Sequence, residues 1–327
     1  MRFFCQWTLF SVLTLAAAAA PPPTLDELFA ELHIAPADRA NLFAGQILST
    51  PITEGSTKEL AAGFAMYVPA PTAKLVEFVR NGKLLANDKD VIAFGELREH
   101  PRPDDLTGIT FTPDQADEEK LLTEVAPGAK FNLATEEIKA FHAQAQAIPV
   151  YRELLLQRHA AYRKGGLAAV TPYDRGNGHA TQPGAELRGA AQESKLFATH
   201  FPELHRALLN FPAQQPDGVI HRFFWINQRI ENRPTFILSH RLAWVQPAGA
   251  LMVESQYYVG HSYNSMQIMV GCLPVNGGTV VFYSNRTYCD QLAGFASPLR
   301  HAIGRSQMRD EIIKTFEQVR TAVTKAP

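Results

Sequence analysis

Apolar and polar residues alternate along the last third of the chain, from about residue 220 to residue 288. Alternation with a period of two is typical of strands that bury one face. Short polar turns divide this stretch into five segments, so the pattern predicts five consecutive antiparallel strands. The turns place four pairs of residues opposite each other: Ile230 and Arg233, Val245 and Ala250, Val259 and Ser262, and Cys272 and Val281.

Each turn carries one face of the predicted sheet to the next strand. The face obtained in this way is nearly continuous and apolar, with a few polar residues: His221, Phe223, Trp225, Asn227, Phe236, Leu238, His240, Leu242, Trp244, Leu251, Val253, Ser255, Tyr257, Val259, Ser262, Asn264, Met266, Ile268, Val270, Cys272, Val281, Tyr283 and Asn285. The opposite face is mixed: Arg222, Arg241, Glu254, Gln256, Gln267 and Arg286 lie there with Phe224, Ile226, Ile237 and Phe282.

A helix is predicted after the last strand. Met308, Ile312, Phe316, Val319 and Val323 are separated by 4, 4, 3 and 4 positions, which is one stripe of an α-helix. The stripe needs an apolar partner, and the sheet face is the nearest one in sequence. The pattern therefore predicts an α+β fold, a curved antiparallel sheet gripped by a long C-terminal helix.

The middle of the chain, at about 112–215, reads as a mostly helical insertion. Helices are expected over 114–125, 136–147 and 150–164, and the glycine- and proline-rich residues 171–189 are expected to form an exposed loop. No stretch resembles a linker between domains, so the sequence predicts a single domain over residues 21–327.

Residues 1–20 resemble a secretory signal peptide. Arg2 is a short positive region, residues 3–15 are mainly apolar, and residues 16–20 are alanines suited to cleavage. A periplasmic or secreted protein of the bacterial envelope is expected, with an uncleaved N-terminal anchor as the alternative. No second apolar run is long enough to cross a bilayer.

Composition narrows the range of partners. The formal net charge is -1, and no basic cluster is present, so nucleic acid is not an expected partner. The chain lacks H-E-x-x-H and C-x-x-C motifs, and we expect neither a metal nor a cofactor. Cleavage would leave Cys272 and Cys289, whose expected separation argues mildly against a disulfide without deciding their oxidation state.

Two stretches carry a resemblance to known proteins. Residues 58–71, KELAAGFAMYVPAP, followed by 75–79, LVEFV, resemble the opening of START-like helix-grip domains. Residues 283–287, Asp290, 294–295 and 303–305 are similar to a motif of uncharacterised exported bacterial proteins. The resemblance implies a pocket for an apolar ligand between sheet and helix, and it supplies no catalytic residues.

The predicted face and helix stripe provide the candidate binding residues: Trp225, Leu238, His240, Tyr257, Asn264, Met266, Tyr283, Asn285, Met308, Ile312 and Phe316. His240 faces Ser255, which suggests a nucleophile and base, although a core histidine bonded to a serine explains the pair more simply. Arg286 and Asp290 are candidates for a clamp on a ligand carboxylate or phosphate, or for an ion pair that holds the loop.

Three functions follow from this pattern. The first is an exported protein that binds a hydrophobic small molecule or lipid in the sheet-helix cavity. The second is an enzyme, a lyase, cyclase or hydrolase, that uses the same pocket. The third is an envelope interaction protein with an exposed apolar patch on the side of Phe224, Ile226 and Phe282.

Overall fold

The computed structural model describes residues 21–80, 83–213, 215–293 and 297–325. The predicted signal peptide and residues 294–295 of the motif lie outside these ranges. Eight strands form one antiparallel sheet in the order β1-β2-β10-β9-β8-β7-β6-β3. Their bounds are Leu48–Thr50 (β1), Glu59–Val68 (β2), Val91–Glu96 (β3), Ile220–Ile230 (β6), Arg233–Gln246 (β7), Gly249–Val259 (β8), Ser265–Val275 (β9) and Gly278–Tyr288 (β10).

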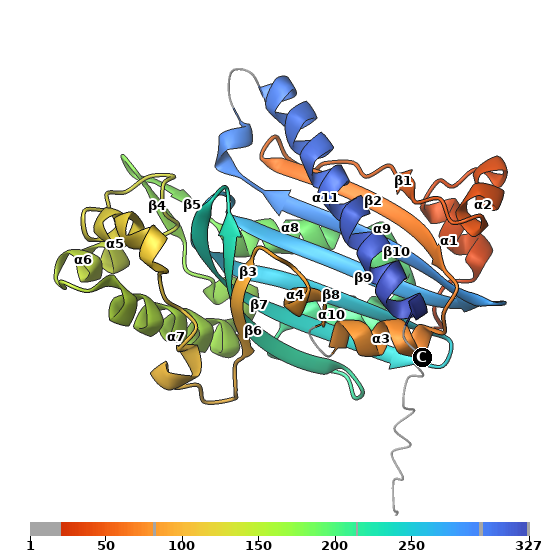
Figure 1. Cartoon of the computed structure of the whole chain (residues 1–327), viewed down its shortest axis with the longest axis horizontal. Helices are drawn as coiled ribbons and strands as arrows, with labels where there is room; N and C mark the ends of the chain where they lie inside the picture. The colour runs from red at the N-terminus through yellow and green to blue at the C-terminus, as the bar shows by residue number, and fades with distance from the viewer. Residues whose placement is uncertain (1–20, 81–82, 214, 294–296, 326–327) are drawn as a thin grey trace, which may run out of the picture.

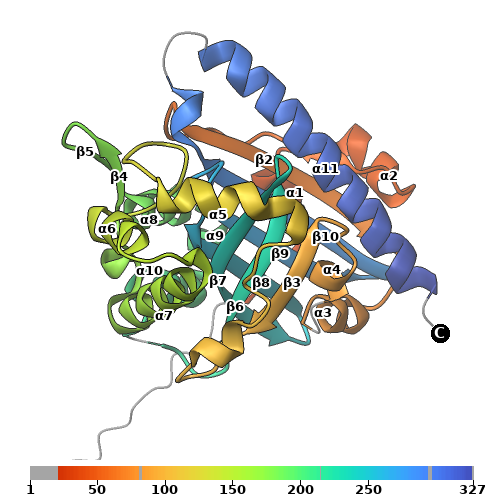
Figure 2. The ribbon, with the colours of Figure 1, turned by 60° about the vertical axis from the view of Figure 1, so that its left-hand side comes forward.

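Helices cover both faces of this curved sheet (Figure 1). One face, called the α11 face, carries α3 (Thr72–Arg80), α4 (Lys83–Ala86) and the long helix α11 (Ser297–Lys325). The opposite face, called the α7 face, is covered by the N-terminal helices α1 (Leu25–Glu31) and α2 (Pro36–Phe43) and by the helices between β3 and β6. In Figure 2 the sheet lies between α11 and the helices α6 and α7.

The segment between β3 and β6 contains most of the helices. Their bounds are Ala116–Thr123 (α5), Thr135–His142 (α6), Ala147–Gly165 (α7), Pro183–Glu193 (α8), Lys195–His200 (α9) and Pro202–Asn210 (α10). Residues 171–189, expected to be a loop, instead contain a hairpin of β4 (Tyr173–Gly176) and β5 (His179–Thr181) and the start of α8. Left-handed backbone angles at Asn177 (φ 52°) and at the glycines on either side of it allow this tight turn.

The fold class is as the sequence predicts: a large antiparallel sheet crossed by a long C-terminal helix, the helix-grip arrangement. Three of the four predicted turn pairings are also confirmed. Ile230 lies opposite Arg233, Val245 opposite Ala250, and Val281 opposite Cys272. Among the described residues, no helix combines the length and the apolar character needed to cross a membrane.

The pairing predicted across Gly260-His261 is wrong. β8 ends at Val259 and β9 begins at Ser265, so the connection is longer than two residues. Val253 pairs with Met269 instead of Ile268, a shift of one residue. Because side chains alternate, this shift moves every later residue to the other face.

Tyr257 and Tyr258 mark a second departure from the predicted pattern. The register of β7 and β8 slips here, since Ser239 pairs with Gln256 but Leu238 pairs with Tyr258. The extra residue of this β-bulge turns both tyrosines toward the α7 face. Val259 consequently packs on the α11 face, in a cluster with Ile237.

Cys272 and Cys289 are not joined in the structure. Cys272 lies on the α11 face, and the Cys289 thiol is 3.2 Å from the carbonyl oxygen of Ser262. Burial raises the pKa of Cys272 to about 12 and also raises that of Cys289. Both thiols are therefore protonated and poorly reactive at neutral pH.

Candidate functional site

The candidate binding residues do not surround one cavity. Those of β6, β7 and β8 face α7: Trp225, Leu238, His240 and Tyr257. Those of the last strands and of the C-terminal helix lie on the α11 side: Met266, Tyr283, Asn285, Met308, Ile312 and Phe316. Asn264 lies in the connection between β8 and β9. The one-residue shift between these strands divides the predicted pocket between two faces of the sheet.

Side chains fill the space between α11 and the sheet. The Phe316 ring meets Tyr283 edge-on with 5.2 Å between ring centroids, and it meets Phe64 at 6.0 Å. Ile312 and Val323 are buried in the same cluster. The contact that grips the sheet is thus a packed core.

A groove lies beside this core, where α3 crosses the sheet. Its cavity volume is about 70 Å³, and its walls are almost entirely apolar. Helix α3 contributes one wall, and the α11 face of β6 to β9 contributes the floor; the lining side chains include Leu75, Val76, Val79, Ile220, Phe224, Ala243, Val245, Ala250, Met252, Val270 and Cys272. Nothing in the sequence pattern pointed to this groove.

Three arginines also line the groove: Arg80, Arg222 and Arg241. Arg241 forms a buried ion pair with Glu254 at 2.5 Å, and Arg222 forms a more exposed pair with Glu96 at 2.5 Å. The hydrogen bond from Arg222 lowers the pKa of the Glu96 carboxyl. Among the described residues, carboxylates pair with Arg222 and Arg241 but none forms an ion pair with Arg80, so these side chains give the groove an excess of positive charge.

Imidazole and phenol side chains form a buried array on the α7 face. His221 Nδ1 is 3.0 Å from His240 Nε2, and His240 Nδ1 is 2.9 Å from the Tyr162 hydroxyl. The Tyr162 ring stacks on Tyr257 with 4.0 Å between centroids and 6° between planes. The Tyr257 hydroxyl lies 2.9 Å from Nδ1 of His159. Sequence reasoning found His240 and Tyr257 but missed the two α7 partners, whose spacing of three positions puts them on one side of a helix.

The geometry does not support His240 and Ser255 as a catalytic pair. The two residues do lie opposite each other, as predicted. However, both imidazole nitrogens contact other side chains, and the Ser255 hydroxyl has no hydrogen-bond partner among the described residues. Burial and then the nearby His221 and Arg163 hold the pKa of His240 well below its usual value. The structure therefore shows a neutral core histidine.

Arg286 and Asp290 do not pair with each other. Arg286 forms a buried ion pair with Glu59 of β2. Asp290 accepts hydrogen bonds from Lys58 at 2.7 Å and Arg175 at 2.8 Å. Burial raises the pKa of Asp290, but the hydrogen bonds that it accepts outweigh this effect and bring it to about 2. Each of these two side chains therefore links segments that lie far apart in the sequence.

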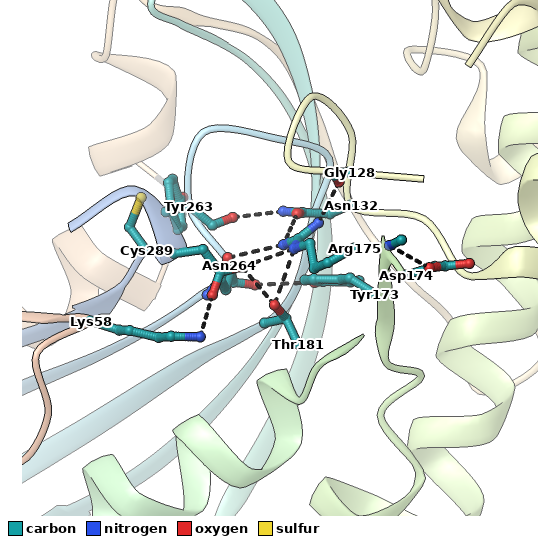
Figure 3. A network of polar contacts seen from close by, with 12 residues as sticks. Lys58, Gly128, Asn132, Tyr173, Asp174, Arg175, Thr181, Tyr263, Asn264 and Cys289 are labelled. Atoms are coloured by element: carbon teal, nitrogen blue, oxygen red, sulfur yellow. Dashed lines mark hydrogen bonds and ion pairs between the residues drawn. The ribbon is translucent and has the colours of Figure 1, made fainter. Parts of the chain in front are cut away.

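Arg175 is the centre of the network of hydrogen bonds that includes Asp290 (Figure 3). Its guanidinium also donates to Asn132 at 2.7 Å and to Asn264 at 3.1 Å. The Asn264 amide donates in turn to Glu186 at 2.9 Å. These bonds fasten the β4-β5 hairpin to the start of β9 and account for the buried position of Asn264. This role could not be predicted from the sequence, because the hairpin reads as an exposed loop.

The described residues contain no group of three or more His, Cys, Asp or Glu side chains that could hold a metal ion. No protein-family model matches the chain, and no curated protein matches it. A solved structure, "Crystal structure of Ara h 8.0201", is similar over 32% of this chain and 67% of its own, with 9% identity and a TM-score of 0.22. A likeness of this size carries no functional argument.

Proposed function

We propose that the groove beside α3 binds a small molecule with a narrow aliphatic chain and an acidic head group. The observation that carries this proposal is the combination of apolar walls with three arginines in one groove. A site of this kind removes an apolar chain from water and orients it by a few polar contacts.

The size of the groove favours a narrow ligand. Pockets that enclose drug-sized molecules measure roughly 300–1,000 Å³, whereas this cavity measures about 70 Å³. A bulky sterol or fused ring system would require α3 to move away from the sheet. A single aliphatic chain lying along the groove requires less displacement.

Two apolar side chains at the groove remain exposed in the structure. Ile220 is 38% exposed and Val245 is 41% exposed, and both lie on strands of the groove floor. Covering such residues stabilises a complex through the hydrophobic effect. The positive excess among Arg80, Arg222 and Arg241 favours a carboxylate on the same ligand.

Octanoate and octanol provide the first test, measured by isothermal titration calorimetry. We expect octanoate to bind with one molecule per chain and octanol to bind more weakly, because only octanoate carries the charge. Ile220→Ser should weaken octanoate binding by roughly fivefold, since part of an isoleucine side chain would lose its apolar contact.

Ile92→Ser is the matched control. Ile92 is 37% exposed and lies on β3 outside the groove lining. The Ile92→Ser variant should bind octanoate as the unchanged protein does. An equal loss in both variants, or no octanoate binding at all, would refute the proposal.

The other two functions receive less support. The enzyme hypothesis relied on His240 and Ser255, which do not form a hydrogen bond to each other among the described residues. The interaction hypothesis expected an exposed apolar patch on the side of Phe224, Ile226 and Phe282. These three residues do not form such a patch, because all three are buried, Phe224 and Ile226 under α4 and β3 and Phe282 among the helices of the α7 face.

We further propose that the chain is exported and that residues 1–20 are removed. The composition of these residues supports this idea. N-terminal sequencing of the protein recovered from the cell envelope or medium would give a start close to Pro21. Recovery of the intact N-terminus would favour the anchor instead.

A further inference from the structure

One end of the large sheet is built from segments without charge. The strand register places the turn between β7 and β8, the turn between β9 and β10, and the end of β2 side by side, through the pairs Gln246–Gly249, Ala250–Cys272, Val275–Gly278 and Thr279–Val68. The segments that meet here contain no Asp, Glu, Lys, Arg or His: residues 60–73, 242–253 and 268–285. We call this part of the molecule the uncharged end.

The opposite end of the same strands is rich in charge. The turn between β6 and β7, the start of β2 and the end of β10 provide Lys58, Glu59, Arg229, Glu231, Arg233, Arg286 and Asp290. Ion pairs form there, such as that of Arg286 with Glu59. The lack of charge is therefore a property of one end of the sheet and not of its strands in general.

Apolar side chains reach the surface at the uncharged end. Val245 is 41% exposed, Ile220 is 38% exposed, and Phe43 of α2 is 41% exposed beside the Tyr67 ring. The turns themselves expose Pro69, Pro71, Pro247, Ala248 and Pro274. Trp244 and Tyr67 are half-buried at the same end, and amphipathic rings of this kind are typical of the boundary between water and lipid.

Charged residues of both signs border the uncharged end. Asp217 lies three positions before β6, and Lys74 lies in the first turn of α3; both are exposed. A border of mixed sign does not attract a strongly charged partner. The surface is therefore suited to a partner that is apolar and carries no net charge.

The described chain begins beside the uncharged end. A methyl group placed on Gly249 would lie 3.5 Å from the Pro22 side chain. Residues 1–20, which directly precede Pro21 in the sequence, have Arg2 as their one charged residue. Their composition is typical of a segment that enters a membrane during export. The folded surface thus lacks charge at the point where the chain leaves this segment.

We propose that the uncharged end docks on the surface of a lipid bilayer whose head groups carry no net charge. Apolar side chains gain free energy when they leave water for the boundary of the acyl chains, and a zwitterionic bilayer requires no complementary charge. The groove beside α3 shares Ile220, Val245 and Ala250 with this end, so docking would bring the groove to lipid-soluble ligands. That consequence rests on the function proposed above, whereas the docking itself does not.

Vesicles of pure phosphatidylcholine are the probe, and the exported protein after removal of residues 1–20 is the sample. We expect the protein to cosediment with these vesicles. High salt should not release it, because no ion pairs hold it there.

An environment-sensitive dye shows which end of the protein touches the vesicle. The dye is attached to Ala248→Cys or, as its control, to Ala302→Cys on α11. Cys272 and Cys289 react poorly with it, because burial raises the pKa of both thiols. Vesicles should shift the dye emission to shorter wavelength in the first variant and leave it unchanged in the second.

Ala248→Asp should weaken vesicle binding by roughly tenfold, because a charge is costly at the apolar boundary of a bilayer. Pro274→Asp adds a charge beside the neighbouring turn and provides the test if Ala248→Asp does not fold. Ala302→Asp is the matched control. Ala302 is exposed on α11 near the exposed apolar side chains of Leu299 and Ile303, and its change should leave vesicle binding as it is.

Three results would overturn the proposal. The first is the absence of cosedimentation with phosphatidylcholine vesicles. The second is an equal loss of binding in Ala248→Asp and Ala302→Asp. The third is a shift of the Ala248→Cys dye that depends on protein concentration without vesicles, which would show that a second copy of the chain covers this end. Ala248 and Pro274 lie outside the groove lining, so their variants should bind octanoate normally, and the two proposals fail independently.

Discussion

The two faces of the sheet are covered in different ways. On the α7 face, aromatic and imidazole side chains of α7 pack on the sheet. Several of them form hydrogen bonds with side chains of the strands, as Tyr162 does with His240. On the α11 face, apolar side chains of α11 pack on the sheet, and a groove remains beside α3. The comparison shows that the same sheet is covered by a polar array of rings on one face and by the apolar stripe of a long helix on the other.

Among the variants that test this comparison, Phe316→Ala is expected to cause the largest loss of stability. Phe316 is 6% exposed and packs against Phe64 and Tyr283. Removal of a buried phenylalanine ring should lower the free energy of unfolding by about 3–5 kcal/mol. Urea denaturation would measure the change.

Leu299→Ala on the same helix is the control. Leu299 is 63% exposed, so its truncation should change stability by less than about 0.5 kcal/mol. If both changes have similarly small effects, α11 does not pack on the sheet in solution as the structure shows.

The stability of the folded chain should fall in acid because of a histidine on the α7 face. His159 has a pKa of about 4 in the folded chain, mainly through burial, and a value near 6.5 is expected in the unfolded chain. Between pH 4 and pH 6.5, the His159 side chain is protonated in a larger fraction of unfolded chains than of folded chains. The folded chain therefore has its full stability above pH 6.5 and loses stability as the pH falls toward 4. This histidine alone accounts for a loss on the order of 3 kcal/mol at pH 4.

Urea denaturation of His159→Gln at pH 7 and pH 4 would isolate this contribution. The variant should lose less stability on acidification than the unchanged protein. His179→Gln, a change at an exposed position of β5, should keep the original pH dependence. Identical pH profiles for all three proteins would show that His159 is not buried as a neutral group.

Tyr162→Phe should have the smallest effect. It removes the hydroxyl that contacts His240 Nδ1 and leaves a buried nitrogen without a partner. The expected loss is about 1–2 kcal/mol in free energy of unfolding. Tyr67→Phe is the control, because its hydroxyl donates to the carbonyl oxygen of Gly277 at an exposed position. Equal effects would indicate that the buried array adds no stability beyond an ordinary surface hydrogen bond.

Local patterns predicted much of the α11 face. The stripe from Met308 to Val323 lies within one helix, and the helix packs against the sheet as expected. The turn at Glu231 and Asn232 has left-handed angles at both residues (φ 52° and 62°), as a two-residue hairpin requires. These features depend on residues close in sequence, which is why the sequence was sufficient to predict them.

The connection between β8 and β9 depends on distant residues. His261 Nε2 lies 2.8 Å from the Thr235 hydroxyl. The Asn132 side chain donates to the carbonyl oxygens of Val259 and Tyr263 at 2.8 and 2.7 Å. Neither contact can be inferred from the spacing of Gly260 and His261, so the register beyond them could not be predicted.

By itself, the sequence determined the strand segments, three of their turns and the apolar stripe of the last helix, because each is set by neighbours a few residues apart. The tertiary structure decided which face β9 and β10 present and where α3 leaves a groove. These features depend on contacts between segments separated by scores of residues, and a shift of one position in a single loop is enough to exchange the faces.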